Sequence, residues 1–277
     1  MNSIYHFFKE IYILKSNFLT INKLENFPFP LEIVSCVNRG IFPDLAIKLN
    51  SDNNIFTGGE LIELKDSDSY VVSSFNSTIP TGKKEIHQFI KGKNSIIRKQ
   101  MEEAGDNIDS LITRDVFYLI RGKKNDNIKV VLIHGSFFET VDNNFLINNA
   151  FFQVLNEMLS QNDLQVSDDL KNLIPQLKSE QENFSKVREI EKASVKLRFR
   201  IMTEVKPEGN ILNSEKYPEI RDNTINFILL KHSEEELKDI QNKFNLVFDK
   251  HLRNDFNSFD IKHHFNGYFR VFQAQLF

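Results

Sequence analysis

The chain has 277 residues, of which 40% are hydrophobic and 26% are charged, which excludes a typical disordered protein and allows one large folded domain. The formal net charge of −3 excludes a globally basic protein, although a local cluster of lysines can still bind nucleic acid. The single cysteine, Cys36, excludes an internal disulfide and a cysteine-based metal cluster.

The N-terminal residues predict a helix. Prolines in residues 27–30 end it, because proline cannot continue a helix. Charged residues interrupt this region before a signal-peptide core could form, and no apolar run reaches membrane length, so we expect a soluble cytoplasmic protein with no membrane contact. The apolar face of the helix recurs at helical spacing, at Ile4, Phe7, Phe8, Ile11 and Leu14.

Residues 31–75 predict a pair of strands. Residues 31–40 fit a strand or a short helix equally well. Two apolar runs follow, at 41–49 and 58–75, with a turn-rich connector between them, which indicates a strand–loop–strand arrangement.

The remaining residues alternate between helical and strand patterns. Helical periodicity is expected over 81–112, a hairpin over 114–138, a helix over 144–159 and strands at 194–205 and 224–231. A helix then begins at Ser233, with Glu236 in the register of a capping box. This order predicts an α/β (α+β) fold in which helices flank a mixed central sheet, with a C-terminal mixed elaboration.

Asp44, Glu63 and Lys65 form the pattern that can carry chemistry. Because side chains alternate along a strand, Glu63 and Lys65 share one face while Ile62 and Leu64 take the other. If the two strands are antiparallel neighbours, Asp44 can approach Glu63, and two adjacent carboxylates are suited to bind Mg²⁺. Such a metal would polarise a phosphodiester, and Lys65 would orient a water or offset phosphate charge.

The pattern alone leaves an ordinary solvent-facing hairpin as the alternative. An acidic residue, any residue and lysine occur in this order five times, starting at Glu63, Asp169, Glu204, Glu236 and Asp260. Pro-Asp occurs once, at residues 43–44, and only the first of the five patterns follows it at hairpin distance between apolar flanks.

The segments 42–49 and 58–67 resemble the signature of the PD-(D/E)XK nuclease superfamily, and 62–78 resembles type II restriction endonucleases in particular. The resemblance implies a restriction-endonuclease-like core in which Asp44 and Glu63 bind Mg²⁺ and Lys65 is the catalytic lysine. It also implies site-specific cleavage of double-stranded DNA by a homodimer. A helical glutamate often assists in the superfamily, and Glu32 is the nearest candidate.

The hydroxyl, amide and lysine side chains of residues 73–84 are suited to contact a DNA backbone, although a polar loop is the simpler interpretation. We expect the nuclease core within 1–140, and sequence recognition and a dimer contact within 141–277; one continuous domain is the alternative. The DNA-contacting candidates are Ser73, Ser74, Asn76, Ser77, Thr78, Lys83 and Lys84.

Other functions remain open on the sequence. A DNA repair or junction-resolving nuclease shares the same core, and a non-catalytic DNA-binding protein would use the strand pair only structurally. His263, His264 and Asn266 faintly resemble a histidine–asparagine nuclease motif but lack its second half. No convincing glycine-rich phosphate loop is present, and we expect no organic cofactor.

Overall fold

The computed structural model of the chain describes residues 3–38, 42–50, 58–72, 74–76, 80–90, 92, 95–139, 143–161, 168 and 202–277. The chain divides into two compact units: unit 1 comprises Met1–Thr140 and Thr203–Phe277, and unit 2 comprises Val141–Met202. The described part of unit 2 consists mainly of one helix, so the features below belong to unit 1 unless stated otherwise.

The described strands are β1 (Val34–Val37), β2 (Leu45–Ile47), β3 (Leu61–Ser67), β4 (Ser74–Asn76), β5 (Lys83–Glu85), β6 (Thr113–Lys124), β7 (Asn127–His134), β8 (Met202–Glu204), β9 (Thr224–Lys231), β10 (Asn257–His263) and β11 (Gly267–Gln275). The described α-helices are α1 (Ser3–Ile13), α2 (Asn17–Thr20), α3 (Ile86–Phe89), α4 (Ile96–Glu103), α5 (Asn143–Ser160, in unit 2), α7 (Glu234–Val247) and α8 (Lys250–Arg253). The described 3-10 helices are η1 (Leu24–Asn26), η2 (Ile108–Ser110), η3 (Gly135–Phe137) and η6 (Pro207–Gly209).

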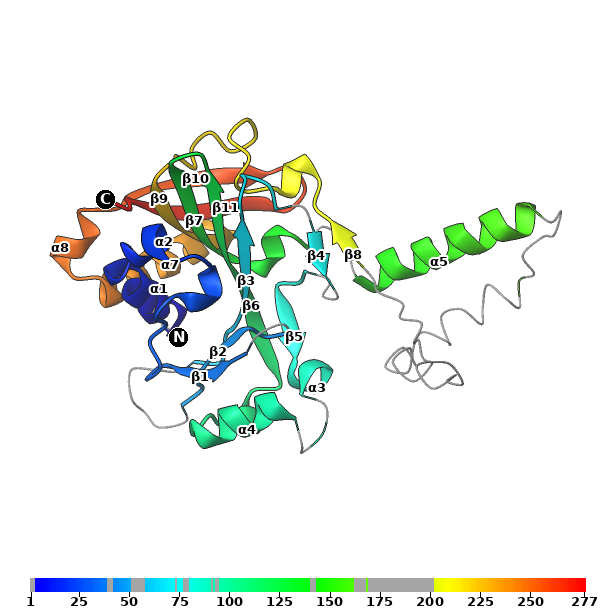
Figure 1. Ribbon diagram of the computed structural model, residues 1–277, viewed down its shortest axis with the longest axis horizontal. Coiled ribbons are helices and arrows are strands. Elements are labelled where there is room, and N and C mark those ends of the chain that lie inside the picture. The colour runs from blue at the N-terminus through cyan, green and yellow to red at the C-terminus, as the bar shows by residue number, and fades with distance from the viewer. Residues whose placement is uncertain are drawn as a thin grey trace. The chain divides into compact units, whose positions relative to one another are not determined.

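A mixed sheet runs through unit 1, and nine of the described strands belong to it (Figure 1). Its order is β1-β2-β3-β6-β7-β9-β11-β10, with β5 paired to β6, while β4 and β8 form a separate two-stranded sheet. The pairs β3–β6 and β7–β9 are parallel, and the others in this order are antiparallel. The unit is therefore an α/β arrangement around a mixed sheet.

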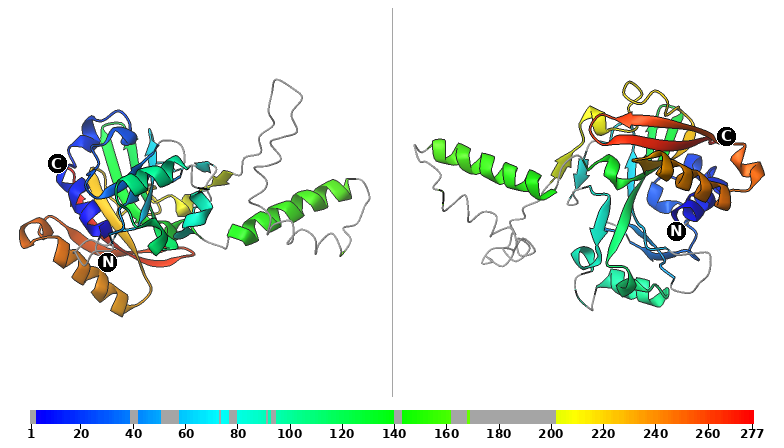
Figure 2. Two further views of the ribbon diagram at one scale, coloured as in Figure 1. Left: turned by 90° about the horizontal axis from the view of Figure 1, so that it is seen from below. Right: turned by 180° about the vertical axis from the view of Figure 1, so that it is seen from behind.

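Two apolar clusters cover the two faces of the sheet. The first contains the buried faces of α1 and α7 together with strand residues such as Ile62 and Leu119. Its aromatic packing is dense: the rings of Phe244 in α7 and Phe272 in β11 stack at 3.9 Å between centroids. Figure 2 shows α7 alongside the β10–β11 hairpin in both views. The second cluster contains residues of α3, α4 and the segment 211–220.

Most of the elements predicted from periodicity are confirmed. The strand pair, the hairpin of β6 and β7, the helix in unit 2 and β9 lie where the sequence indicates. The N-terminal helix is also present, but it ends at Ile13 and not at the prolines of residues 27–30, because α2 and η1 follow it as separate short helices. The capping box of α7 is also present: Ser233 Oγ accepts from Glu236 N at 3.1 Å, while Glu236 Oε2 accepts from His232 N at 2.6 Å. The ambiguous segment after residue 30 forms the strand β1.

Two further predictions of element extent are wrong. Residues 81–112 are not one helical stretch, because 83–85 pair with β6 as a strand and Gly92, at φ +82°, lies between α3 and α4. The strand expected over 58–75 ends at Ser67, and β4 begins separately. Most of the strand expected over 194–205 lies outside the described residues, and its last part contains β8.

Candidate active site

The pairing of β2 with β3 brings two carboxylates together. The strands are antiparallel, and Leu45 lies opposite Ile62. Asp44 precedes the first of these residues and Glu63 follows the second, so the two acidic residues meet across the strand pair. The sequence-based expectation that Asp44 approaches Glu63 is confirmed.

Glycine makes the close approach of the chain before β3 feasible. A Cβ atom added to Gly58 would lie 1.8 Å from the carbonyl oxygen of Lys48, a distance that no side chain can tolerate. The next residue, Gly59, has φ +117°, in a region that residues with a Cβ rarely adopt. These two glycines therefore fix where β3 begins relative to β2.

The faces of β3 also follow the predicted alternation. Ile62 and Leu64 pack in the first apolar cluster, with the helices α1 and α7. Leu61 belongs to the second cluster on the opposite face, and Glu63 and Lys65 follow it at intervals of two. The side chains of Glu63 and Lys65 thus occupy the face that α3, α4 and the segment 211–220 cover.

Asp44 is held in place by the backbone of β3. Its Oδ2 accepts a hydrogen bond of 2.8 Å from Leu64 N. Burial, followed by the negative charge of Glu63, raises the pKa of Asp44 to about 6, against the lowering effects of the Leu64 N–H and Lys65. A carboxylate is therefore kept in a site that disfavours its charge.

Glu63 and Lys65 form an ion pair in which the two oxygens of the carboxylate differ in their contacts. Lys65 Nζ lies 2.9 Å from Glu63 Oε1. Glu63 is only 7% exposed, and its Oε2 is buried with no hydrogen-bond partner among the described residues. A buried carboxylate oxygen without a partner is costly unless a further ligand completes it.

Tyr118 is a neighbour of this site that the sequence did not reveal. It lies beside Glu63 in the parallel register of β3 and β6 and is fully buried. Burial, and next the charge of Glu63, raises the pKa of its hydroxyl. No sequence signal marked it, because Glu63 and Tyr118 are more than fifty residues apart in the chain and meet only through the parallel pairing of β3 with β6.

The other side of β3 is clamped by an arginine. The guanidinium of Arg121 holds the Asp66 carboxylate with two hydrogen bonds, one of them 2.8 Å from Nε to Oδ1, and also donates to the carbonyl oxygens of Phe18, Ile21 and Asn22. Asp66 in turn accepts from Leu24 N at 2.8 Å, which ties η1 to β3. These contacts fix the strand immediately after Lys65.

A third acidic residue near the pair is Glu25, in η1. Its charge also raises the pKa of Asp44, as the weakest of the effects acting on that group. Glu32, the candidate for an assisting helical glutamate, instead lies exposed in a turn before β1. Sequence periodicity could not single out Glu25, because it lies in an irregular segment that one 3-10 turn interrupts.

The predicted DNA-contacting residues are described only in part. Ser73, Ser77 and Thr78 lie outside the described residues, and Ser74 and Asn76 are placed only as backbone in β4. Lys83 and Lys84 lie in β5, which pairs with β6 in antiparallel orientation.

Lys84 lies close to the loop that carries Asp44. Its Nζ lies 4.4 Å from the centroid of the Phe42 ring, two residues before Asp44. Of the predicted contact residues with described side chains, Lys84 is the one that this packing places against that loop.

The histidine–asparagine alternative is not favoured by the geometry. His263 Nδ1 accepts from the backbone N–H groups of Phe265 and Asn266, and burial, followed by the charge of His264, lowers the pKa of His263 to about 4. The Asn266 amide donates to the carbonyl oxygens of Ser136 and Phe137. These side chains stabilise the turn between β10 and β11.

Cys36 is buried and donates to Gln100 Oε1 at 3.2 Å.

The acidic pair fits Mg²⁺ as a ligand set. Mg²⁺ is usually held by one or two carboxylates and keeps several waters, and the buried Oε2 of Glu63 is an oxygen that a cation would satisfy. Burial, and after it repulsion by Glu63, raises the pKa of Asp44, and a bound cation would relieve that repulsion. Among the described residues, no group of three or more histidine, cysteine, aspartate or glutamate side chains is arranged to hold a metal.

Comparison of the chain with protein-family models, with curated proteins and with solved structures found no match. None of the described helices combines the length and apolar character needed to cross a membrane.

Proposed function

We propose that this protein is a Mg²⁺-dependent endonuclease that hydrolyses phosphodiester bonds of double-stranded DNA, of the type II restriction class with a restriction-endonuclease-like core. The observation that carries the proposal is the convergence of Asp44, Glu63 and Lys65. Among the described residues, a half-buried and a buried carboxylate lie beside one lysine, and one oxygen of Glu63 has no hydrogen-bond partner.

Each residue of the site has a defined task under this proposal. Asp44 and Glu63 would hold the cation, which when bound would polarise the phosphodiester and make a bound water more acidic. Lys65 would orient the attacking water or offset charge on the phosphate, since its Nζ is already positioned by Glu63. The Leu64 N–H keeps one oxygen of Asp44 engaged, which fixes the rotation of that carboxylate.

We also propose that the protein acts as a homodimer, since double-strand cleavage at a two-fold site requires two equivalent centres. Sequence recognition is assigned to the C-terminal region. Residues of that region extend the same sheet through β9, β11 and β10, so a recognition surface there would be rigidly connected to β3.

The test is digestion of long unmethylated DNA by the purified chain with Mg²⁺. We expect discrete fragments, and we expect Lys65→Ala and Glu63→Gln to lower the cleavage rate by at least about 10²-fold while DNA binding persists. Lys262→Ala is the matched control: Asp260, Ile261 and Lys262 form the same tripeptide pattern on a strand, and Lys262 is exposed. EDTA should abolish cutting.

Other outcomes would select among the alternatives. A smear or single nicks, lost with Lys65→Ala, would indicate a repair or junction-resolving nuclease. Bound but uncut DNA at high protein concentration would indicate a non-catalytic DNA-binding protein. Equal loss of cutting in Lys262→Ala and Lys65→Ala would contradict the assignment of the site.

A further inference from the structure

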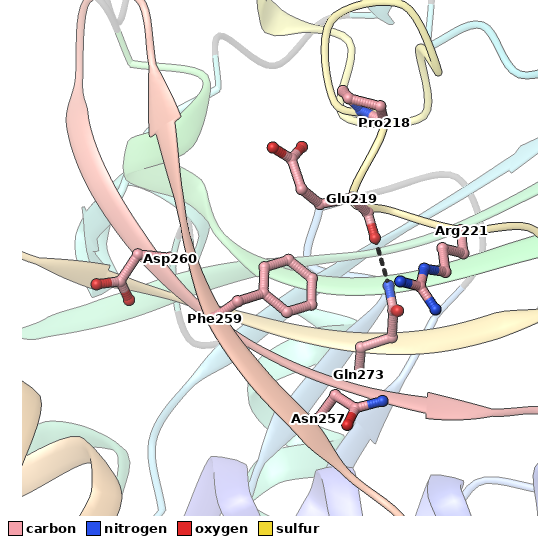
Figure 3. Close-up of a pocket in the computed structure, with 7 residues that line it drawn as sticks. All are labelled: Pro218, Glu219, Arg221, Asn257, Phe259, Asp260 and Gln273. Carbon is pink, nitrogen blue, oxygen red and sulfur yellow. Dashed lines mark hydrogen bonds between the residues drawn. The ribbon is translucent and has the colours of Figure 1, made fainter.

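A second candidate site lies on the same face of the sheet, far from Asp44. It is a cavity of ≈ 710 Å³, within the range of small-molecule sites. The loop before β9 contributes Pro218, Glu219 and Arg221 to its lining, and the strands contribute Asn257, Phe259 and Gln273 (Figure 3). Asp260 also borders it, but its side chain turns away in Figure 3 and pairs with Lys231 and Arg270.

A buried amide network holds the floor of this cavity. Gln273 is 4% exposed, and its Nε2 donates to Glu219 O at 2.9 Å and to Asn226 Oδ1 at 2.8 Å. An amide nitrogen carries two protons, so both are used, and the atom that Gln273 can present to a ligand is its acceptor oxygen Oε1. The amide is thereby oriented before any ligand arrives.

The same network fixes the loop that borders the cavity. Asn226 Nδ2 donates to Val130 O at 3.1 Å and to Thr224 Oγ1 at 2.9 Å. Thr224 Oγ1 in turn donates to Arg221 O at 2.6 Å. Satisfied buried polar networks rigidify what they connect, so the backbone at Glu219 and Arg221 is held against the sheet.

The exposed lining offers the groups that recognise a nucleotide. Phe259 is half-buried and presents a ring on which a base can stack. Asn257 lies directly opposite Gln273 on the neighbouring strand, so two amides face the same space, and amides are suited to base edges. Among the described lining residues Arg221 is the one cation, which suits a single phosphodiester charge better than a polyphosphate.

The position of the cavity relative to the acidic pair follows from the strand register. Lys65 is in register with Ile120, Val131, Asn226 and Gln273 in turn across four successive strand pairs. Directly paired residues share a face, so Lys65 and Gln273 lie on the same side of the sheet. Four strand spacings amount to about 19 Å, or about five to six base pairs of B-DNA.

We infer that this cavity binds one nucleotide of a DNA strand, with the base stacked on Phe259 and its phosphate at Arg221. The fixed acceptor of Gln273 suits an exocyclic amino group, which adenine, cytosine and guanine carry, whereas thymine offers it only the ring N3–H. The role as a recognition contact rests on the proposed nuclease function; the binding of a nucleotide does not.

The first experiment measures nucleotide binding to the full chain by saturation-transfer NMR titration. We expect dAMP and dCMP to bind, dTMP to bind about tenfold more weakly, and Arg221→Ala to weaken binding about tenfold. Arg221 and Asn257 are exposed, so their alanine variants leave the buried network intact. Ser258→Ala and Lys262→Ala are the controls, because both are exposed on β10 and point to the other face.

The second experiment distinguishes a strand from a free nucleotide. Anisotropy with short homopolymeric strands should show dA and dC strands bound more tightly than dT, and Arg221→Ala should weaken binding of all three strands, because Arg221 contacts the phosphate. Mononucleotide binding that depends on Arg221, with unchanged strand binding, would support the cavity and name a free nucleotide as its ligand. Absence of any effect of Arg221→Ala in both assays, or equal binding of thymine, would overturn the inference.

Failure of this inference and failure of the nuclease proposal are separable. Glu63→Gln should abolish cleavage and leave dAMP binding unchanged. A chain that never cuts DNA but binds dAMP through Arg221 would contradict only the nuclease proposal. Cleavage that depends on Glu63, without Arg221-dependent binding of any nucleotide, would contradict only the nucleotide cavity.

Discussion

Two pairs of charged side chains on the same side of the sheet, one fully buried and one partly buried, differ in how their charge is compensated. Asp106 and Arg114 have fully buried side chains and are joined by hydrogen bonds of 3.0 and 3.2 Å, and Ser35 Oγ adds a third contact to the carboxylate at 2.7 Å. Asp44 and Glu63, in contrast, are two acids beside one lysine in the part of the chain that the structure describes.

The difference distinguishes a charged pair that stabilises the fold from a pair of carboxylates that can bind a further ligand. The charge of the Asp106 carboxylate is neutralised by a dedicated guanidinium, although the Nε atom of Arg114 has no hydrogen-bond partner among the described residues. The acidic pair is under-compensated, because burial and like charge both disfavour ionised Asp44 and one oxygen of Glu63 has no partner among the described residues. Perturbed and incompletely satisfied carboxylates of this kind are typical of functional sites.

The largest expected effect concerns the buried pair of Asp106 and Arg114. Asp106→Asn should lower the free energy of unfolding by about 3–5 kcal/mol, because Arg114 would remain as a buried charge without its counter-ion. Urea denaturation measures this change. Asp109→Asn is the control, since Asp109 pairs with Arg98 on the surface and should matter little. Equal effects of the two substitutions would break the comparison.

A substitution of Asp44 is expected to have the opposite effect on the free energy of unfolding. Its folded-state pKa of about 6 lies above the ordinary value of 3.8, so the folded chain binds more protons than the unfolded chain between these values. Stability from this group therefore falls as pH rises through that window. Asp44→Asn should raise the free energy of unfolding by on the order of 2 kcal/mol at pH 8, while cleavage is lost.

Urea titrations of wild type and Asp44→Asn at several pH values test this prediction. The gap between the two proteins should be largest above pH 6 and should close as the pH falls below 3.8, where Asp44 is mainly neutral in both states. The amide oxygen of Asn can still accept from the Leu64 N–H, so the substitution keeps that contact. A variant less stable than wild type at pH 8 would contradict the account of the site.

The smallest expected effect is stabilisation by the cation itself. Mg²⁺ at ten times its dissociation constant should stabilise the wild type by about 1.4 kcal/mol and should leave Asp44→Asn unchanged. Thermal denaturation with Mg²⁺ or EDTA measures the difference. The effect should weaken at pH 5, because protons compete with the cation for Asp44. Equal stabilisation of both proteins would place the cation elsewhere.

Local pattern was sufficient to predict much of the fold. Period-two apolarity located β3 and assigned Ile62 and Glu63 to opposite faces, and helical spacing located α1. The same pattern predicted that Asp44 approaches Glu63, since a short antiparallel pair is a local arrangement. These features depend on residues close together in the chain.

Long-range features could not be predicted in this way. Arg121 was one of several basic residues near a hairpin, yet it is buried and clamps Asp66 across the parallel β3–β6 pair. Tyr118 reaches Glu63 only through that same pairing. The Gln273 cavity requires a loop and two C-terminal strands to come together, and no local periodicity encodes such a meeting.

The alternation along β3 has an evolutionary consequence. Asp66, Ile62 and Leu64 secure the strand from one face, while Glu63 and Lys65 occupy the other with Asp44 opposite them. Changes in the acidic pair therefore leave the folding determinants intact, and a single-nucleotide codon change from aspartate to asparagine would even relieve repulsion. Under the proposed function, a lineage released from selection for DNA cleavage would lose the chemistry first and keep the scaffold as a DNA-binding protein.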